Sequence, residues 1–561
     1  MNQESMKENE NNNSFEKEIN SYENQRGRDI NVNISNENDQ MAFDKDLEEN
    51  KSSNLPKLLR PRSKIYNISL ALLLGSGGLF FGMQMSIFNP LEGPLLKNIY
   101  NLEKEARITA SGSINLYFSL GAMMIMLLCP HLSKKLGRVK TLVLAESIAV
   151  LTMVLYNIID LRVLYLARFL AGAVAGINTA IGQLTIKELL PKSFRGLGGM
   201  IIYISVGLGV TSCFSLRVFL TQSYIIQTWR WIISSYIPVS IIRLTFFTLL
   251  LKYDTPMFYI QKKQLTKDPI YDLRAKSALR KIYKREDTDR AFEEQMDNYN
   301  ALEKEDKGLL SIILADEYKE RLRAALLVAM GQQLTGINFL IFFSESIFDE
   351  ISGNGALQTF RIGICKFFVG IIGLYVIKRY GNKTLLIIPV LLQSFCFLLI
   401  YLFVKFNIVT GMVFATLGYI CSFAIGMGPV ALIYIADVLP ANGIGIALAV
   451  QWFFTGVVGK LVPYLDEKLG AKFLFLLFSI LCLFVALANT YFLIETKNLT
   501  DFEIKANFYK KFRGVLLENL HGVEIENNCE VEDKDVKFEQ GDVKIGDEDA
   551  YFDNNKSKLL K

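Results

Sequence analysis

Residues 134–144 read KKLGRVKTLVL, and residues 377–387 read IKRYGNKTLLI. A second pair of similar stretches, KELLP at 187–191 and ADVLP at 436–440, is separated by nearly the same distance along the chain. Each stretch follows an apolar segment, and the two members of a pair occupy the same place within their half of the chain. Two matches at one offset indicate an internal duplication, and parallel repeats of this kind are typical of secondary transporters.

Apolar segments long enough to cross a bilayer recur along most of the chain. Of the 561 residues, 51% are hydrophobic, and a helix needs about 20 residues to cross the hydrocarbon core. Helices are favoured because the segments are long and contain glycine, which bilayer helices tolerate. We therefore predict an all-α polytopic membrane protein with twelve transmembrane helices in two six-helix halves. The predicted spans are 65–89, 112–133, 140–160, 163–187, 196–220, 229–251, 322–348, 357–377, 384–404, 409–436, 445–465 and 472–494.

Polar segments flank and divide these spans. Residues 1–62 are rich in Asn, Glu, Asp, Ser and Lys, a composition that predicts a disordered tail, although it could also carry a docking or degradation signal. The polar connector 252–321 has apolar residues at helical spacing, so we expect short amphipathic helices there. The two halves are then 63–251 and 322–496, and a second, largely disordered tail follows at 497–561.

The distribution of basic residues predicts the orientation in the membrane. Lysine and arginine gather in the connector and in the loops on its side, for example at Lys134, Lys135, Lys192 and Lys378. Cytoplasmic loops carry such an excess. We therefore expect both termini and the connector to be cytoplasmic, in an integral protein of the plasma membrane.

Composition excludes several classes of protein. The net charge of +5 is small and suggests no nucleic-acid partner. With two histidines, and with six of the seven cysteines in or at the edge of apolar spans, neither a metal site nor a disulfide framework is expected. No nucleophile, metal or phosphate-loop motif is visible, so we expect no enzyme and no cofactor. The partners we expect are the lipid bilayer and a small solute.

Several short motifs follow one another along the spans. They are GLFFG (78–82), LGRVK (136–140), ARFLAG (167–172), ELLPKSFRG (188–196), TWRW (228–231), QQLTGIN (332–338), GMGPV (426–430) and IETKN (494–498). In this order they resemble the sugar porter branch of the major facilitator superfamily, from about Leu72 to Ile504. The resemblance implies a carrier that moves a sugar by alternating access.

The resemblance places sugar contacts in the motif QQLTGIN. In the family, residues that match Gln332, Gln333 and Asn338 contact the sugar. Side-chain amides suit this role because they both donate and accept hydrogen bonds without a buried charge. Gly336 lets the helix bend and opens more directions for these amides. Alternatively, the amides could hold neighbouring helices together.

Other substrate contacts rest on alignment with the family. Tyr203 stands at a sugar-contacting position of the fifth span, and the pair Gln451–Trp452 aligns with an Asn-Trp pair, which makes Trp452 a candidate. Gln84 stands where proton-coupled sugar porters carry an aspartate. Because an amide cannot titrate, Gln84 favours a facilitator.

Three charged residues in the spans leave questions open. Glu146 and Glu345 could still carry a proton, although Glu146 reads better as a paired structural group. Lys366 aligns with a sugar-contacting Asn of the family, and a lysine at the centre of a bilayer helix costs about 2.5–3.5 kcal/mol. It could pair with Glu345 or Glu146, donate to sugar hydroxyls, bind an anionic substrate, or extend toward an interface.

Charged residues at the connector side resemble a gating network of the family. Such contacts would link spans when the carrier faces outward and break during transport, or they could be ordinary charges of the inner surface. The gating candidates are Arg138, Glu188, Arg195, Arg379, Asp437 and Glu495.

The first functional hypothesis is a facilitative transporter of a hexose-like sugar such as glucose. Two alternatives remain open. One is a transporter-like sugar sensor that signals through its tails. The other is a carrier of an anionic sugar derivative or another small polar solute, possibly coupled to protons.

Overall fold

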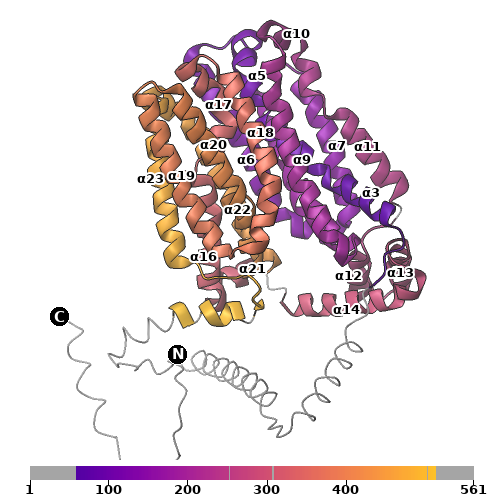
Figure 1. The fold of residues 1–561 in the computed structure, drawn as a ribbon. Coiled ribbons are helices and arrows are strands. Elements are labelled where there is room, and N and C mark those ends of the chain that lie inside the picture. Colours follow the sequence, from indigo (N-terminus) through magenta and orange to yellow (C-terminus); the bar gives the residue numbers. More distant parts are fainter. Residues whose placement is uncertain (1–58, 252, 306–308, 502, 509, 513–561) are drawn as a thin grey trace, which may run out of the picture. The chain divides into compact units, whose positions relative to one another are not determined.

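The computed structural model describes residues 59–512, except 252, 306–308, 502 and 509 (Figure 1). This part of the chain is almost entirely helical, and twelve of its helices are long and apolar enough to cross a membrane. The twelve predicted spans are confirmed. They are Lys64–Ile99, Lys104–Leu136, Arg138–Tyr156, Leu161–Leu189, Lys192–Phe219, Ser223–Leu249, Tyr318–Ser352, Gly355–Arg379, Asn382–Lys405, Val409–Val438, Asn442–Leu469 and Ala471–Phe492.

The first half consists of six spans, of which the first and sixth are broken. Its elements are α3 (Lys64–Gly75), α4 (Gly77–Ser86), α5 (Phe88–Pro94), a π-turn (Leu95–Ile99), α6 (Lys104–Leu136), α7 (Arg138–Tyr156), α8 (Leu161–Leu189), α9 (Lys192–Phe219), α10 (Gln222–Ile233), α11 (Ile237–Thr245) and a second π-turn (Phe246–Leu250). Glycine allows α6 and α8 to approach closely, since a Cβ on Gly121 or Gly172 would meet a backbone carbonyl of the other helix.

The connector forms the short amphipathic helices that its sequence predicts. They are α12 (Pro256–Thr266), α13 (Ile270–Ile282), a 3-10 turn (Arg285–Asp287), α14 (Thr288–Glu305) and α15 (Leu309–Leu314). The helices α12, α13 and α14 lie at one end of the spans, which we call the connector end, and the opposite end is the distal end (Figure 1).

The start of the described chain is tied to the connector. Pro61 forms an antiparallel β-bridge with Tyr283, and Arg60 Nη2 lies 2.6 Å from Glu286 Oε2. The last residues of the tail predicted at 1–62 are therefore held by the connector. Residues 1–58 lie outside the described residues, so the structure does not test the disorder predicted for them.

The second half repeats the arrangement of the first. Its elements are α16 (Asp316–Leu334), α17 (Ile337–Ser352), α18 (Gly355–Arg379), α19 (Asn382–Lys405), α20 (Val409–Ile425), α21 (Met427–Val438), α22 (Ala441–Leu469) and α23 (Ala471–Phe492). Residues 498–512 belong to a separate compact unit, in which Phe508 stacks on Phe512. The rest of the tail predicted at 497–561 lies outside the described residues.

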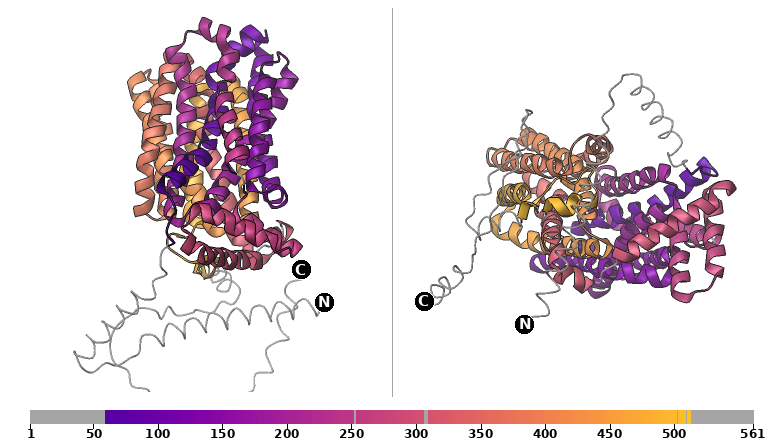
Figure 2. Two further views of the ribbon diagram at one scale, coloured as in Figure 1. Left: turned by 90° about the vertical axis from the view of Figure 1, so that its right-hand side faces the viewer. Right: turned by 90° about the horizontal axis from the view of Figure 1, so that it is seen from below.

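The two halves meet along two pairs of long helices. The second span of the first half, α6, packs on α22, the fifth span of the second half, and α9 packs on α18 in the reciprocal way. Figure 2 shows the two halves side by side. In each half the second span therefore contacts the fifth span of the other half, as expected of two similar units. This confirms the six-plus-six architecture.

Candidate functional site

The motif QQLTGIN lies where the seventh span is broken. Gly336 adopts a left-handed conformation with φ of +84°, so α16 ends at Leu334 and α17 begins at Ile337. A left-handed φ suits glycine, which has no Cβ. The break lets the amides before and after it turn to the same place, as the bend predicted at Gly336 requires.

The predicted amides form one hydrogen-bonded group with two residues of α22. Gln332 Nε2 donates to the carbonyls of Met427 and Gly428, at 2.9 and 3.0 Å, and Gln332 Oε1 accepts from the side chains of Gln333 and Gln451. Asn338 Nδ2 donates to Gln333 Oε1 and to Thr455 Oγ1. We call this group the amide cluster; its members are Gln332, Gln333, Asn338, Gln451 and Thr455.

The amide cluster retains unused hydrogen-bonding capacity. Asn338 Oδ1 and Gln451 Oε1 are buried and accept no hydrogen bond from a described residue. Buried polar atoms are rarely left without a partner. The two oxygens could accept hydrogen bonds from the hydroxyls of a solute.

Trp452 places the amide cluster next to the seam between the halves. Its indole packs edge-on against Phe81 of α4 and Phe118 of α6, with ring centroids 5.7 and 5.8 Å apart. Since Gln451 is its neighbour on α22, the cluster lies beside the contact with the first half. The structure thus brings Trp452 close to the predicted amides.

Gln84 lies apart from the amide cluster. It is 2% exposed, and its Oε1 accepts a hydrogen bond from Tyr156 at 3.0 Å within the first half. Its backbone carbonyl accepts from Arg168 Nη1 at 2.8 Å, and Arg168 lies over the rings of Phe88 and Phe118. Among the described residues, no carboxylate lies within ion-pair distance of Arg168. An acidic side chain at position 84 would stand next to this cation, whereas the side chain of Gln84 is neutral and accepts from Tyr156.

Glu146 has its partner in the sixth span. Arg243 Nε lies 2.8 Å from Glu146 Oε1, and both side chains are almost fully buried. Asn178 and Ser240 also donate to Glu146, and Arg243 donates to the backbone of Leu73. The network joins four spans of the first half. It supports the interpretation of Glu146 as a structural group and excludes, in this structure, a pair of Glu146 with Lys366.

Glu345 is paired across the seam at the distal end. Arg217 Nε on α9 lies 2.7 Å from Glu345 Oε1 on α17. Next to this pair, Asn89 of α5 donates to the Ile341 carbonyl and to Ser344 Oγ, and accepts from the backbone N–H of Glu345. The pairing of Lys366 with Glu345 is therefore also excluded. These contacts hold the halves together on the distal side of the amide cluster.

We predict that Glu345→Gln shifts the carrier toward a form that is open at the distal end. The pair is partly exposed, so its loss is worth about 1 kcal/mol, or roughly a fivefold change in populations. The measurement is the rate at which an impermeant maleimide labels Ile341→Cys, in a background without other reactive cysteines. The reversed pair Arg217→Glu with Glu345→Arg should restore the slow rate. Lys276→Gln, which breaks a pair with Asp289 inside the connector, should leave the rate as in the wild type. Unchanged labelling of Glu345→Gln would show that the pair does not hold this end closed.

Tyr203 and Lys366 lie at the other seam, between α9 and α18. The ring of Tyr203 packs over Gly370, where an added Cβ would lie 3.3 Å from the tyrosine hydroxyl oxygen. Lys366 is partly exposed and is one turn away on the same helix. No hydrogen bond of the described residues joins either side chain to the amide cluster.

At the connector end, two of the predicted gating residues, Arg138 and Glu188, pair between neighbouring spans of the first half. Arg138 Nη2 lies 3.0 Å from Glu188 Oε1, and Asp254 accepts from the backbone N–H groups of Arg138 and Val139 at the start of α7. Burial raises the pKa of Asp254, and these N–H groups oppose the rise. Arg195 donates to the Leu190 carbonyl.

The second half contains the same arrangement with a different residue. Asn382 Nδ2 donates to Asp437 at 3.0 Å, and Glu495 accepts from the backbone N–H groups of Asn382 and Lys383 at the start of α19. Arg379, which the resemblance also placed in this network, does not take part in it in this structure. Arg379 is exposed and forms no hydrogen bond or ion pair with a described residue, and Asn382 occupies the place that Arg138 has in the first half.

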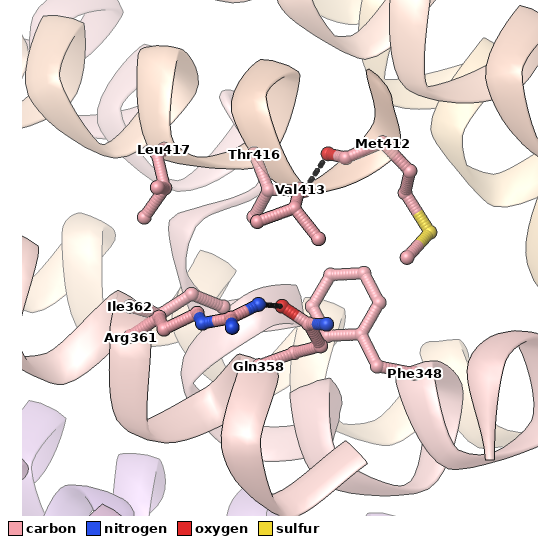
Figure 3. Close-up of a pocket in the computed structure, with 8 residues that line it drawn as sticks. All are labelled: Phe348, Gln358, Arg361, Ile362, Met412, Val413, Thr416 and Leu417. Atoms are coloured by element: carbon pink, nitrogen blue, oxygen red, sulfur yellow. Dashed lines mark hydrogen bonds between the residues drawn. The ribbon is translucent and has the colours of Figure 1, made fainter. Parts of the chain in front are cut away.

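A small pocket at the distal end of the second half does not suit a solute. It lies between α18 and α20 near Arg361, which donates to Gln358 at 3.2 Å (Figure 3). Its volume is about 10 Å³, room for roughly one water molecule. The candidate site therefore remains at the seam.

Sequence reasoning missed two parts of this region. Thr455 lies four residues after Gln451 on α22, so the helical spacing alone places both on one face. Asn382 follows the glycine of IKRYGNK just as Arg138 follows the glycine of KKLGRVK, and aligning the two glycines identifies it.

Together, the twelve spans in two similar halves and the buried amides beside their seam define a membrane carrier. The family model described as "Sugar (and other) transporter" matches residues 71–508. The chain belongs to this family.

Curated relatives and solved structures agree with this assignment. The arabinose-proton symporter of Bacillus subtilis is 24% identical over 473 residues, which cover 82% of this chain and 98% of the symporter. Facilitated glucose transporter member 4 of Homo sapiens is 24% identical over 412 residues, 70% of this chain and 78% of that one. The inward open conformation of the xylose transporter XylE from E. coli has a TM-score of 0.66 at 18% identity, covering 79% of this chain and 100% of XylE. These relatives are transporters, and the chain is not an enzyme.

Proposed function

We propose that this protein is a facilitative carrier of a hexose-like sugar in the plasma membrane, and that both termini and the connector are cytoplasmic. The observation that supports it best is the amide cluster. Five side chains from three helices, four of them buried and Gln451 partly exposed, offer hydrogen bonds at the seam between the halves. Two of their oxygens have no partner among the described residues. A sugar needs such groups because its hydroxyls both donate and accept.

Names of the relatives support the substrate class more than the mode of transport. The similar proteins include an arabinose-proton symporter and facilitated glucose transporters. Gln84 favours the facilitative mode, because it is an amide hydrogen-bonded to Tyr156 at the position where the resemblance places the proton-coupling acid.

Alternating access requires that one end of the seam opens while the other closes. Arg217–Glu345 and Asn89–Ser344 close the distal end in this structure. The contacts Arg138–Glu188 and Asn382–Asp437 each lie within one half. We assign them to keeping each half rigid as it rotates, with Asp437 and Glu188 at the ends of helices that approach the other half.

The test is sugar uptake by the purified full chain in proteoliposomes, with a panel of labelled hexoses and pentoses. We expect saturable uptake of a hexose that stops at the outside concentration and is unchanged by a protonophore. Accumulation above that level, lost with the protonophore, would replace the facilitator by a proton-coupled carrier. Binding of a sugar without any uptake would favour the sensor.

A further inference from the structure

Lys366 points away from lipid. The α18 side chains of Phe368, Ile372 and Tyr375 are exposed on the outer surface of the spans. Lys366 precedes them by two, six and nine residues, which at about 100° per residue places it on the opposite side of the helix. The neighbours on that side, Gly363 and Gly370, pack against α9 of the first half. Lys366 therefore faces the seam.

Lys366 lies at the depth of the amide cluster. Thr359 donates to Ser344 at 2.9 Å, which fixes α18 beside the antiparallel α17. From this contact toward the connector end, Asn338 is six residues away and Lys366 seven, or about 9 and 10.5 Å at the helical rise. Positions 338 and 366 are thus level with each other along the spans, beneath the distal contacts that join Asn89 to Ser344.

The positive charge of Lys366 is not balanced within the described part of the chain. Lys366 forms no hydrogen bond or ion pair there, while Glu146 and Glu345 are bound to Arg243 and Arg217. A neutral sugar would leave this charge unbalanced in a site of low dielectric, whereas an anionic group would form a charge-assisted hydrogen bond with it.

We propose that the substrate is a sugar acid, whose carboxylate binds the ammonium of Lys366 while its hydroxyls bind the amide cluster. This inference rests on the proposed function and narrows its substrate class. A carboxylate fits better than a phosphate because Lys366 supplies one positive charge. Arg217 and Arg243 are already paired with carboxylates, and Arg168 donates to backbone carbonyls of the first half. A phosphate would therefore bring a second negative charge without a partner.

The experiment compares three labelled probes, D-glucuronate, D-glucose and D-glucose 6-phosphate, in proteoliposomes that hold the full chain. We expect glucuronate to be taken up with the lowest half-saturation concentration. Lys366→Gln should raise that concentration roughly 10- to 100-fold, the loss expected for a charge-assisted hydrogen bond, and should thereby remove the preference for glucuronate over glucose. Lys366→Arg should retain most glucuronate uptake. Arg361→Gln, which removes another cation of α18 outside the seam, should change the half-saturation concentration of neither glucuronate nor glucose.

A second readout needs only the wild-type chain. Uptake of an anion carries charge, so a potassium diffusion potential that is positive inside should speed glucuronate uptake and leave glucose uptake unchanged. Glucose uptake without glucuronate uptake would overturn this inference and leave the proposed function intact. Preference for glucose 6-phosphate would overturn the choice of a carboxylate. Uptake of none of the three probes, nor of any other sugar, would overturn the proposed function itself.

Discussion

Arg243→Met is expected to destabilise the protein by about 3–5 kcal/mol, because it leaves the carboxylate of Glu146 buried without its partner. Arg243 Nε lies 2.8 Å from Glu146 Oε1, and the two side chains are 1% and 0% exposed. The same arginine donates to the Leu73 carbonyl, to Ser76 Oγ and to Asn178 Oδ1, so three further contacts of the first half are affected with it. The measurement is thermal unfolding of the purified protein in detergent.

Two further variants make this result specific. The double variant Arg243→Met with Glu146→Met should recover much of the lost stability, since it removes both charges. Arg323→Met breaks an exposed pair with Glu320, of which the arginine is 54% exposed, and should cost less than about 1 kcal/mol. If Arg243→Met unfolded at the wild-type temperature, the pair would not hold the spans of the first half together.

Gln333→Ala is expected to raise the half-saturation concentration for sugar roughly 5- to 150-fold, a loss of about 1–3 kcal/mol. Gln333 links two members of the amide cluster, since it donates to Gln332 Oε1 at 3.2 Å and accepts from Asn338. Its removal takes one hydrogen bond from each of them and leaves a bound hydroxyl short of a partner. The measurement is the concentration dependence of initial uptake into proteoliposomes.

A buried amide outside the cluster provides the control. Gln393 of α19 is 0% exposed and does not contact the amide cluster among the described residues. Gln393→Leu should leave the half-saturation concentration within about twofold. An equal effect of the two substitutions would mean that Gln333 acts only through helix packing, which is the alternative that the sequence left open.

The fold could be predicted because its signals are local. Apolar stretches of the length of a bilayer, the glycine break at 336 and the duplicated stretches at 134–144 and 377–387 each follow from physical constraints on short segments. The ends of the spans were less accurate. The first span continues through a π-turn to Ile99, well past the predicted end at residue 89, because polar residues there lie at the distal surface.

Partners of charged residues could not be predicted, because they depend on packing between distant segments. From the sequence, Glu146 and Glu345 were both possible partners of Lys366. In the structure each acid is bound to an arginine instead, Glu146 to one 97 residues away and Glu345 to one 128 residues away. Arg379 was assigned because it matches a position of the family's gating network. In the structure the backbone N–H of Asn382, at the start of α19, donates to Glu495, and the side chain of Asn382 donates to Asp437.

The central claim is that the two halves alternate about the amide cluster and carry a sugar across the membrane. Counterflow tests it most directly: proteoliposomes are loaded with a high concentration of unlabelled sugar, and labelled sugar is added outside. A carrier whose site faces one side at a time returns loaded with the label, so the labelled sugar inside should rise above its equilibrium level and then fall. A smooth approach to equilibrium without an overshoot, for a sugar that the protein transports, would contradict alternating access.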